Sequence, residues 1–200
     1  MKILVGCEFT GMVRTELTKL GHYAVSCDLT PTERPGRHRR CDVRDLLEDG
    51  WDALIAFPPC QYLARSGLHW LHKQPGRIER AELALEFVQT LMDAPIGKIA
   101  IENPYGLIST RIRPPDQVIH PWQFGHTESK ATCLWLKNLP KLVPTEVMAK
   151  PEAGWDNHRA DGQHYMGSAA TRAKDRSRTY YGVAKAMADQ WFGPAADYWR

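Results

Sequence analysis

Apolar residues along this chain come in short uninterrupted runs, separated by stretches in which they recur at helical spacing. The run Lys2–Gly6 predicts a buried strand, and the apolar stripe from Gly11 to Leu20 that follows it predicts an amphipathic helix. The stripe over Arg77–Met92 is the broadest and predicts the longest helix. A last helix is predicted over residues 179–191.

The other apolar runs predict further strands. Two prolines stop the strongest run after Phe57. Residues 31–40 combine prolines, a glycine and a charged stretch, and are predicted to form a loop. The predicted strands are Lys2–Gly6, Tyr23–Cys27, Cys41–Val43, Trp51–Phe57, Lys98–Ile101 and Thr132–Leu136. Near-continuous apolar strands separated by helices indicate an α/β fold, with a mostly parallel sheet covered by helices on both faces.

Length and composition favour a single domain over residues 1–200, because a chain of this size supports one hydrophobic core. Residues 138–177 hold little periodicity, many prolines and glycines and a basic run, which together predict a loop-rich insertion. No apolar window approaches 18 residues, and the first apolar run is too short for a signal peptide. The protein is therefore expected in the cytoplasm, without membrane contact.

Charge and cysteines narrow the chemistry only slightly. A net charge of +3 allows an anionic ligand without requiring nucleic acid. The five cysteines lie far apart and contain no CxxC pair, so neither a disulfide framework nor a metal site is predicted. Four of them, Cys7, Cys27, Cys41 and Cys133, are expected to act as small buried hydrophobes.

The turn after the first predicted strand and the residue after the second carry a candidate cofactor site, because ligands of open parallel sheets bind beyond the strands' carboxyl ends. Gly6 and Gly11 let a ligand approach the backbone at a helix N-terminus, and Asp28 can accept hydrogen bonds from a ribose. The turn lacks GxGxxG and carries Glu8, which would repel a pyrophosphate. The pattern favours a nucleoside cofactor without phosphate, such as S-adenosylmethionine, although the glycines can also be turn residues only.

Cys60 and Glu102 stand at the ends of two further predicted strands. Two prolines precede Cys60, which would fix the backbone and present the thiol at the sheet edge rather than in the core. Glu102 would lie at the same edge, where partial burial raises the pKa of a carboxyl group and makes it a proton donor. A nucleophile and an acid are thus expected to face one cleft. The alternative for residues 102–104 is a helix N-terminal cap.

Residues 59–61 (Pro-Cys-Gln) and 102–104 (Glu-Asn-Pro), in this order, resemble two motifs of the cytosine-5 DNA methyltransferases, in particular short members from bacteriophage genomes. The resemblance covers residues 1–136 and resumes over residues 178–191. It implies a Rossmann-like class I methyltransferase fold, S-adenosylmethionine as cofactor, and catalytic roles for Cys60 and Glu102. It also implies that Asp28 binds the cofactor's ribose and that Asp42 contacts its adenine.

Some positions depart from the family's pattern. The family carries Gln-x-Arg-x-Arg near the cytosine, where this chain has Glu128, Lys130 and Thr132. In place of a separate target-recognition domain the chain offers only residues 138–177. These residues mix aromatic and basic side chains, which suits base stacking and phosphate contacts or, alternatively, a solvated loop.

The function predicted from the sequence is methyl transfer from S-adenosylmethionine to carbon 5 of cytosine in DNA, through a covalent adduct at Cys60. Two alternatives stay open, which are modification of a free pyrimidine nucleotide and a nucleic-acid or protein-binding module without turnover. The oligomeric state also stays open, and a phage-encoded protein would act in the host cytoplasm. The predicted cofactor-binding residues are Gly6, Glu8, Phe9, Gly11, Asp28, Asp42 and Pro58. The predicted substrate-binding residues are Gln61, Arg65, Asn103, Lys130 and Arg176, of which the three cations are candidates for phosphate contacts.

Overall fold

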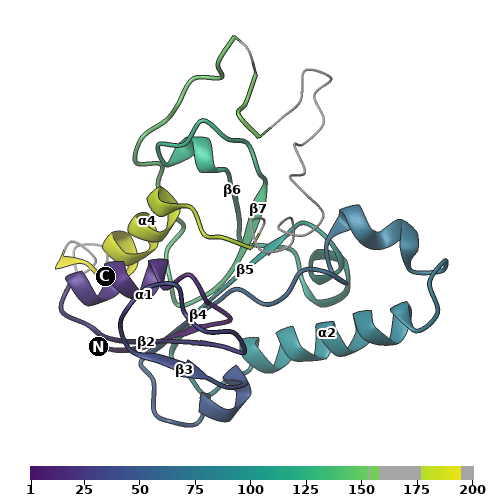
Figure 1. Cartoon of the computed structure of the whole chain (residues 1–200), viewed down its shortest axis with the longest axis horizontal. Coiled ribbons are helices and arrows are strands. Elements are labelled where there is room, and N and C mark those ends of the chain that lie inside the picture. Colours follow the sequence, from purple (N-terminus) through teal and green to yellow (C-terminus); the bar gives the residue numbers. More distant parts are fainter. Residues whose placement is uncertain (153, 158–176, 195–200) are drawn as a thin grey trace.

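The computed structural model describes residues 1–152, 154–157 and 177–194, and these residues form a seven-stranded sheet with helices on both faces (Figure 1). The strand order is β3-β2-β1-β4-β5-β7-β6, and β7 runs antiparallel to both of its neighbours. The strands are β1 (Lys2–Gly6), β2 (Tyr23–Asp28), β3 (His38–Arg40), β4 (Ala53–Ala56), β5 (Lys98–Pro104), β6 (Gln117–Ile119) and β7 (Thr132–Lys137). The first five follow the doubly wound order of a Rossmann-like sheet, which confirms the predicted α/β fold.

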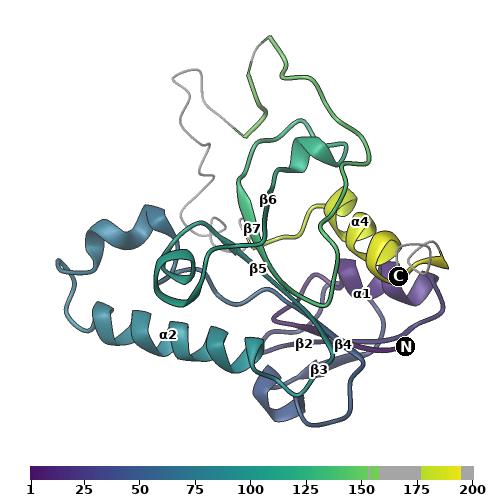
Figure 2. The same cartoon turned by 180° about the vertical axis from the view of Figure 1, so that it is seen from behind.

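Two helices cover one face of the sheet and one long helix covers the other (Figure 2). The helices α1 (Met12–Lys19) and α4 (Tyr181–Phe192) lie side by side on the first face, and α2 (Arg77–Met92) lies on the second. Side chains alternate between the two faces along each strand, so one strand contributes to the apolar layers on both faces. In β1, Ile3 and Val5 face α1 and α4, while Leu4 faces α2. The short helical turns are η1 (Val43–Leu46), η2 (Arg65–Trp70), η3 (Ile108–Ile112) and η4 (Pro121–Gln123).

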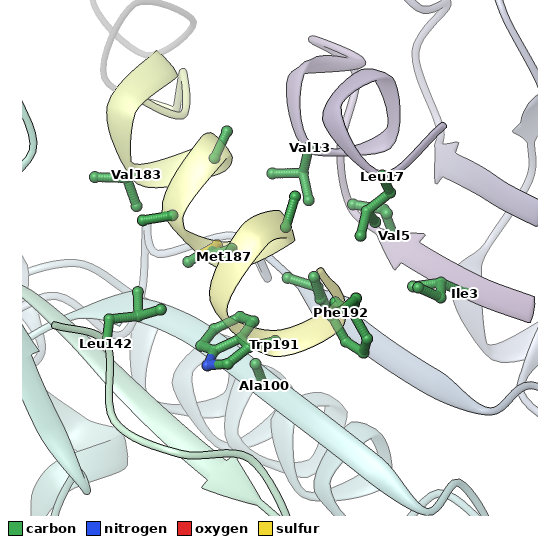
Figure 3. Close-up of a cluster of buried hydrophobic side chains, with 14 of the residues drawn as sticks. Ile3, Val5, Val13, Leu17, Ala100, Leu142, Val183, Met187, Trp191 and Phe192 are labelled. Atoms are coloured by element: carbon green, nitrogen blue, oxygen red, sulfur yellow. The ribbon is translucent and has the colours of Figure 1, made fainter. Parts of the chain in front are cut away.

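The layer between α1, α4 and the sheet fixes the position of the last helix. Figure 3 shows Val13 and Leu17 of α1 beside the apolar side of α4, which carries Met187 and Trp191. Trp191 is 2% exposed, and its indole N–H donates to the carbonyl of Pro140 over 2.9 Å. Truncating a buried tryptophan costs about 3–5 kcal/mol, so α4 is firmly attached to the sheet.

Most predicted elements are confirmed, and α2 has the predicted bounds at both ends. The third strand is a correction, because it is His38–Arg40 rather than Cys41–Val43. The carboxylate of Asp42 accepts the backbone N–H of Arg44 and caps η1, so the chain turns away from the sheet there. β3 itself is an exposed, charged edge strand, which lacks the apolar signal of an inner strand.

The fifth strand is longer than predicted. β5 continues through Glu102 to Pro104 and pairs with β7, where Glu102 lies opposite Leu134. The alternative of a helix cap over residues 102–104 is therefore wrong. None of the described helices is both long and apolar enough to cross a membrane.

Candidate active site

The described residues form a pocket of about 90 Å³ where β4 and β5 end and β7 begins. Five of the predicted site residues line it, namely Pro58, Cys60, Glu102, Asn103 and Lys130. The segment that leads into α4 also lines the pocket, through Arg178 and Tyr180. Pockets for whole small-molecule ligands measure about 300–1,000 Å³, so this one suits a single ring or a group of that size.

The thiol of Cys60 is held by a tight turn after β4. Pro58 is buried and Pro59 is exposed, and neither can donate a backbone hydrogen bond that would continue the strand. The carbonyl of Cys60 accepts the N–H groups of Leu63 and Ala64 over 3.0 and 2.9 Å. Cys60 therefore starts the turn, and its side chain is partly exposed in the pocket.

A glycine after β5 holds this turn in place. The N–H of Leu107 donates to the carbonyl of Leu63 over 2.8 Å, and the N–H of Arg65 donates to the carbonyl of Tyr105 over 2.9 Å. A Cβ atom at Gly106 would lie 1.9 Å from the carbonyl oxygen of Leu63. The two loops can approach this closely only because residue 106 is glycine. The sequence analysis missed this residue, and its only signal is a glycine shortly after the Glu-Asn-Pro motif.

Glu102 presents an acid to the same pocket. Burial raises the pKa of its carboxyl group, while the charge of Lys130 and a hydrogen bond from Thr132 lower that pKa by a smaller amount. The net direction is upward, so protonation of Glu102 is easier than for an exposed glutamate. A protonated carboxyl group in the pocket can donate a hydrogen bond to a ligand.

Asn103 connects the two strand ends. Its side chain is 1% exposed, and its Nδ2 donates to the carbonyl of Pro58 over 2.7 Å. Its Oδ1 is buried and has no hydrogen-bond partner among the described residues. Asn103 thus fixes the backbone two residues before Cys60.

Lys130 and Tyr180 form a further part of the pocket wall. The Nζ of Lys130 lies 6.0 Å from the centre of the Tyr180 ring, and the Tyr180 hydroxyl donates to the carboxylate of Glu128. Burial, followed by the contact with Glu128, raises the pKa of Tyr180, so the phenol stays protonated. Glu128 therefore holds the Tyr180 side chain that lines the pocket, and Lys130 supplies a positive charge to the pocket lining. His126 accepts the N–H of Gly182 over 3.0 Å and fixes the start of α4.

Arg178 joins the pocket to the loop after β2. Its two terminal nitrogens donate to the two carboxylate oxygens of Glu33 over 2.6 and 2.9 Å. Its guanidinium carbon lies 5.9 Å from the centre of the Phe9 ring, and the carbonyl of Phe9 accepts the N–H of Glu33 over 2.9 Å. The wall of the pocket is thus tied to the turn that contains the candidate cofactor residues. No local sequence pattern predicts this pair, because the two residues are 145 positions apart.

The acids of the candidate cofactor site lie near the end of β1. Oδ1 of Asp28 accepts the N–H and the hydroxyl of Thr30, each over 2.8 Å. Asp42 makes two bonds with the guanidinium of Arg44, which lowers the pKa of the Asp42 carboxyl group. Burial raises the pKa of the Cys7 thiol, and the charges of Asp28 and Asp42 raise it further. Asp28 follows Cys27, which pairs with Gly6, and Asp42 precedes Val43, which packs against Gly6, so both acids lie near the end of β1.

The other residues of the first turn have roles inside the fold. Glu8 is 2% exposed and accepts the N–H groups of Val13 and Arg14 over 2.7 and 3.4 Å, which caps α1. Burial is the main cause that raises the pKa of Glu8 to about 7. Gly11 has a φ of 66°, in the left-handed region that favours glycine. A Cβ atom at Gly6 would lie 2.7 Å from Cγ2 of Val43, so this glycine permits close packing of η1 on β1.

Three predicted substrate residues lie outside the pocket lining or outside the described residues. Gln61 and Arg65 are exposed on the turn that follows Cys60. Arg176 lies outside the described residues. Among the residues that the structure describes, no group of three or more histidine, cysteine, aspartate or glutamate side chains could hold a metal ion.

Comparison with known proteins gives a distant structural likeness only. No family model matches the chain, and no curated protein matches it. One solved structure that is similar to it is classed as a DNA modification methyltransferase encoded within an Escherichia coli prophage. The two share 11% sequence identity at a TM-score of 0.46, over 74% of this chain and 52% of that one. This chain thus matches about half the length of that protein.

Proposed function

We propose that this protein transfers a methyl group from S-adenosylmethionine to carbon 5 of cytosine in DNA. The observation that carries the proposal is the shared pocket of Cys60 and Glu102, at the carboxyl ends of two neighbouring parallel strands. A thiol and an easily protonated carboxyl group are the two groups that this chemistry needs, one to attack the ring and one to bind a ring nitrogen.

In the proposed reaction the Cys60 thiolate forms a bond to carbon 6 of the ring. Glu102 donates a hydrogen bond to ring nitrogen 3, which stabilises the electron density that the addition places on the ring. Carbon 5 becomes nucleophilic and would take the methyl group from the sulfonium, whose C–S bond breaks to leave a neutral thioether. A water molecule would then take the proton from carbon 5, which restores the double bond, breaks the C–S bond at carbon 6 and releases Cys60 as thiolate. Asn103 contributes by holding the Pro58 carbonyl and thereby the position of Cys60.

The residues near the end of β1 fit the cofactor in part. S-adenosylmethionine supplies an electrophilic methyl group when it is bound. Oδ2 of Asp28 has no partner among the described residues, so it is available to a ribose hydroxyl. Asp42 would have to exchange its contact with Arg44 for one with the adenine. That ion pair is largely exposed, and exposed pairs contribute only about 0–1 kcal/mol, so the exchange is inexpensive.

Charge in the pocket supports a nucleotide as the substrate. Lys130 lines the pocket and can contact a phosphate, whereas Arg178 also lines it but binds Glu33 through both terminal nitrogens. A pocket of this size admits a single base, so a cytosine in a duplex would have to rotate out of the stack first.

The test is transfer of labelled methyl from S-adenosylmethionine to DNA, to RNA and to deoxycytidylate, measured side by side. We expect label in DNA, and Cys60→Ser should abolish transfer while it leaves cofactor affinity unchanged. DNA that contains 5-fluorocytosine should trap a covalent adduct on Cys60, because fluorine cannot leave as the proton does. Cys41→Ser is the matched control, since Cys41 is also partly exposed but lies outside the pocket, and it should retain the adduct.

Three other outcomes would replace the proposal. Faster labelling of deoxycytidylate than of any DNA would identify a nucleotide-modifying enzyme. Cofactor or DNA binding without any transfer would identify a binding module. Transfer by Cys60→Ser at more than a few per cent of the wild-type rate would exclude the covalent mechanism.

The cofactor site has its own test. Asp28→Ala should weaken S-adenosylmethionine binding by about 1–3 kcal/mol, the contribution of a hydrogen bond to a charged group. Glu102→Gln should leave that affinity unchanged and reduce the rate. Calorimetry of both variants separates the cofactor site from the catalytic pocket, and unchanged affinity in Asp28→Ala would place the cofactor elsewhere.

A further inference from the structure

Two cysteine thiols lie side by side near the candidate cofactor site and outside the pocket. The sulfur atoms of Cys27 and Cys41 are 3.7 Å apart, and the Cys27 thiol donates to the carbonyl of Cys41 over 3.1 Å. Cys27 lies in β2 and Cys41 directly follows β3, and both pack into the apolar layer on the α2 side of the sheet. The sequence separates them by 14 residues, and only the pairing of β2 with β3 brings them together.

We propose that Cys27 and Cys41 are a site of oxidative modification, which a peroxide converts to a disulfide. The Cys41 sulfur attacks one peroxide oxygen, the O–O bond breaks, and Cys41 becomes a sulfenic acid with release of water. The Cys27 sulfur then attacks the Cys41 sulfur, the S–O bond breaks, and a second water leaves. Two thiols are oxidised by two electrons in total, and one hydrogen peroxide is reduced to two waters.

Exposure decides the order of the two steps. Cys41 is partly exposed and can meet the peroxide, whereas Cys27 is 0% exposed. Burial raises the pKa of Cys27 to about 12, with a smaller contribution from the neighbouring Cys41 thiol. Cys27 is therefore a poor first nucleophile in contact with solvent and the natural partner for a sulfenic acid that forms beside it.

The sheet can accommodate the bond. A disulfide requires about 2.05 Å between the sulfur atoms, so the two must approach by roughly 1.6 Å. β3 is a three-residue strand at the edge of the sheet, and its only strand partner among the described residues is β2. Because no strand among the described residues pairs with its outer side, β3 can shift without breaking strand pairing on that side.

The shift would act on the two acids of the candidate cofactor site, because Asp28 follows Cys27 and Asp42 follows Cys41. Asp42 also caps η1, whose Val43 packs against Gly6. We therefore expect the disulfide to weaken S-adenosylmethionine binding. This consequence rests on the proposed function, whereas formation of the disulfide does not.

The experiment treats the full-length reduced chain with hydrogen peroxide, blocks remaining thiols and digests it with trypsin without reductant. Mass spectrometry should find the peptide of residues 20–37 joined to that of residues 41–44, with the loss of two hydrogens. Dithiothreitol should separate them. Cys41→Ser and Cys41→Ala should both abolish the joined species, and Cys60→Ser should retain it. Joined peptides that contain Cys7 or Cys60 instead, or a Cys41 sulfinic acid without any link, would overturn the proposal.

A second measurement tests the consequence for the cofactor. Calorimetry should show at least a tenfold loss of S-adenosylmethionine affinity in the oxidised chain, and dithiothreitol should restore the affinity. Peroxide treatment of the Cys41→Ser variant should leave its affinity unchanged. A disulfide with unchanged affinity would overturn the predicted effect on the cofactor. If the reduced chain does not bind S-adenosylmethionine, the proposed function fails while the joined peptides still support the modification site.

Discussion

Replacement of Asn103 by alanine tests whether the end of β5 positions Cys60. The substitution removes the 2.7 Å bond to the Pro58 carbonyl and leaves that buried oxygen without a donor. An unsatisfied buried carbonyl costs about 1–3 kcal/mol. For a chain of this length the midpoint of thermal unfolding should fall by about 2–12 °C. The methyl-transfer rate should fall as well, because Pro58 lies two residues before Cys60.

The assay compares Asn103→Ala and Asn103→Asp with Asn138→Asp by denaturant unfolding, thermal unfolding and methyl transfer. Asn138 makes the same kind of bond, from its side-chain amide to the carbonyl of Gly97 over 2.8 Å, but it is exposed. Asn138→Asp should change the free energy of unfolding by no more than about 0.5 kcal/mol. Asn103→Asp should cost at least as much as the alanine variant at pH 7.5 and less at pH 5, where the new carboxyl group can be protonated and donate. Wild-type stability and rate in Asn103→Ala would refute the reasoning.

Three further changes test other contacts. Glu8, whose pKa of about 7 is raised in the folded state, binds more protons when folded than when unfolded, so the free energy of unfolding should fall as pH rises from about 4.5 to 7. Glu8→Gln should remove that pH-dependent contribution, which is at most roughly 3 kcal/mol. Denaturant titrations give the free energy of unfolding at pH 5 and at pH 7.5, and an equal fall between the two pH values in both proteins would contradict this. Gly106→Ala should lower both stability and rate, since its Cβ would overlap the Leu63 carbonyl, and unfolding and transfer assays that match the wild type would show that the two loops move apart freely. Glu33→Arg and Arg178→Glu should each raise the KM for DNA and the double exchange should restore it in part, whereas additive losses would show that the pair does not position the pocket wall.

The inner elements of the fold could be predicted because their sequence signals are strong and local. Arg77–Met92 buries apolar residues at helical spacing from Ala81 to Leu91, β4 is an uninterrupted apolar run, and β1 is one after its first residue. β3 could not be predicted, because its three residues are charged or polar and gain their strand conformation only by pairing with β2. The strand predicted at Cys41–Val43 failed for a related reason, since the cap at Asp42 outweighs a weak apolar pattern.

The candidate site also contains some residues that could be predicted from local sequence signals and others that could not. Cys60 and Glu102 could be placed at one sheet edge, since each comes shortly after the apolar run of its strand and parallel strands end on the same side. The side-chain use of Glu8 could not be predicted, because its carboxylate turns inward to cap α1. The contacts of Arg178 with Glu33 and of Cys27 with Cys41 depend on strand order, which no local pattern encodes.

The pairing of α1 with α4 has a consequence for how the chain folds as it is synthesised. Val13 and Leu17 leave the ribosome early, but the helix that covers them comes from residues 181–192. Until those residues emerge, one face of the growing sheet remains in contact with water, and a partly folded species of this kind is prone to aggregate. A nascent chain stalled before Tyr181 should therefore bind chaperones that recognise apolar surface, and release from them should depend on Met187 and Trp191 more than on any residue of the pocket.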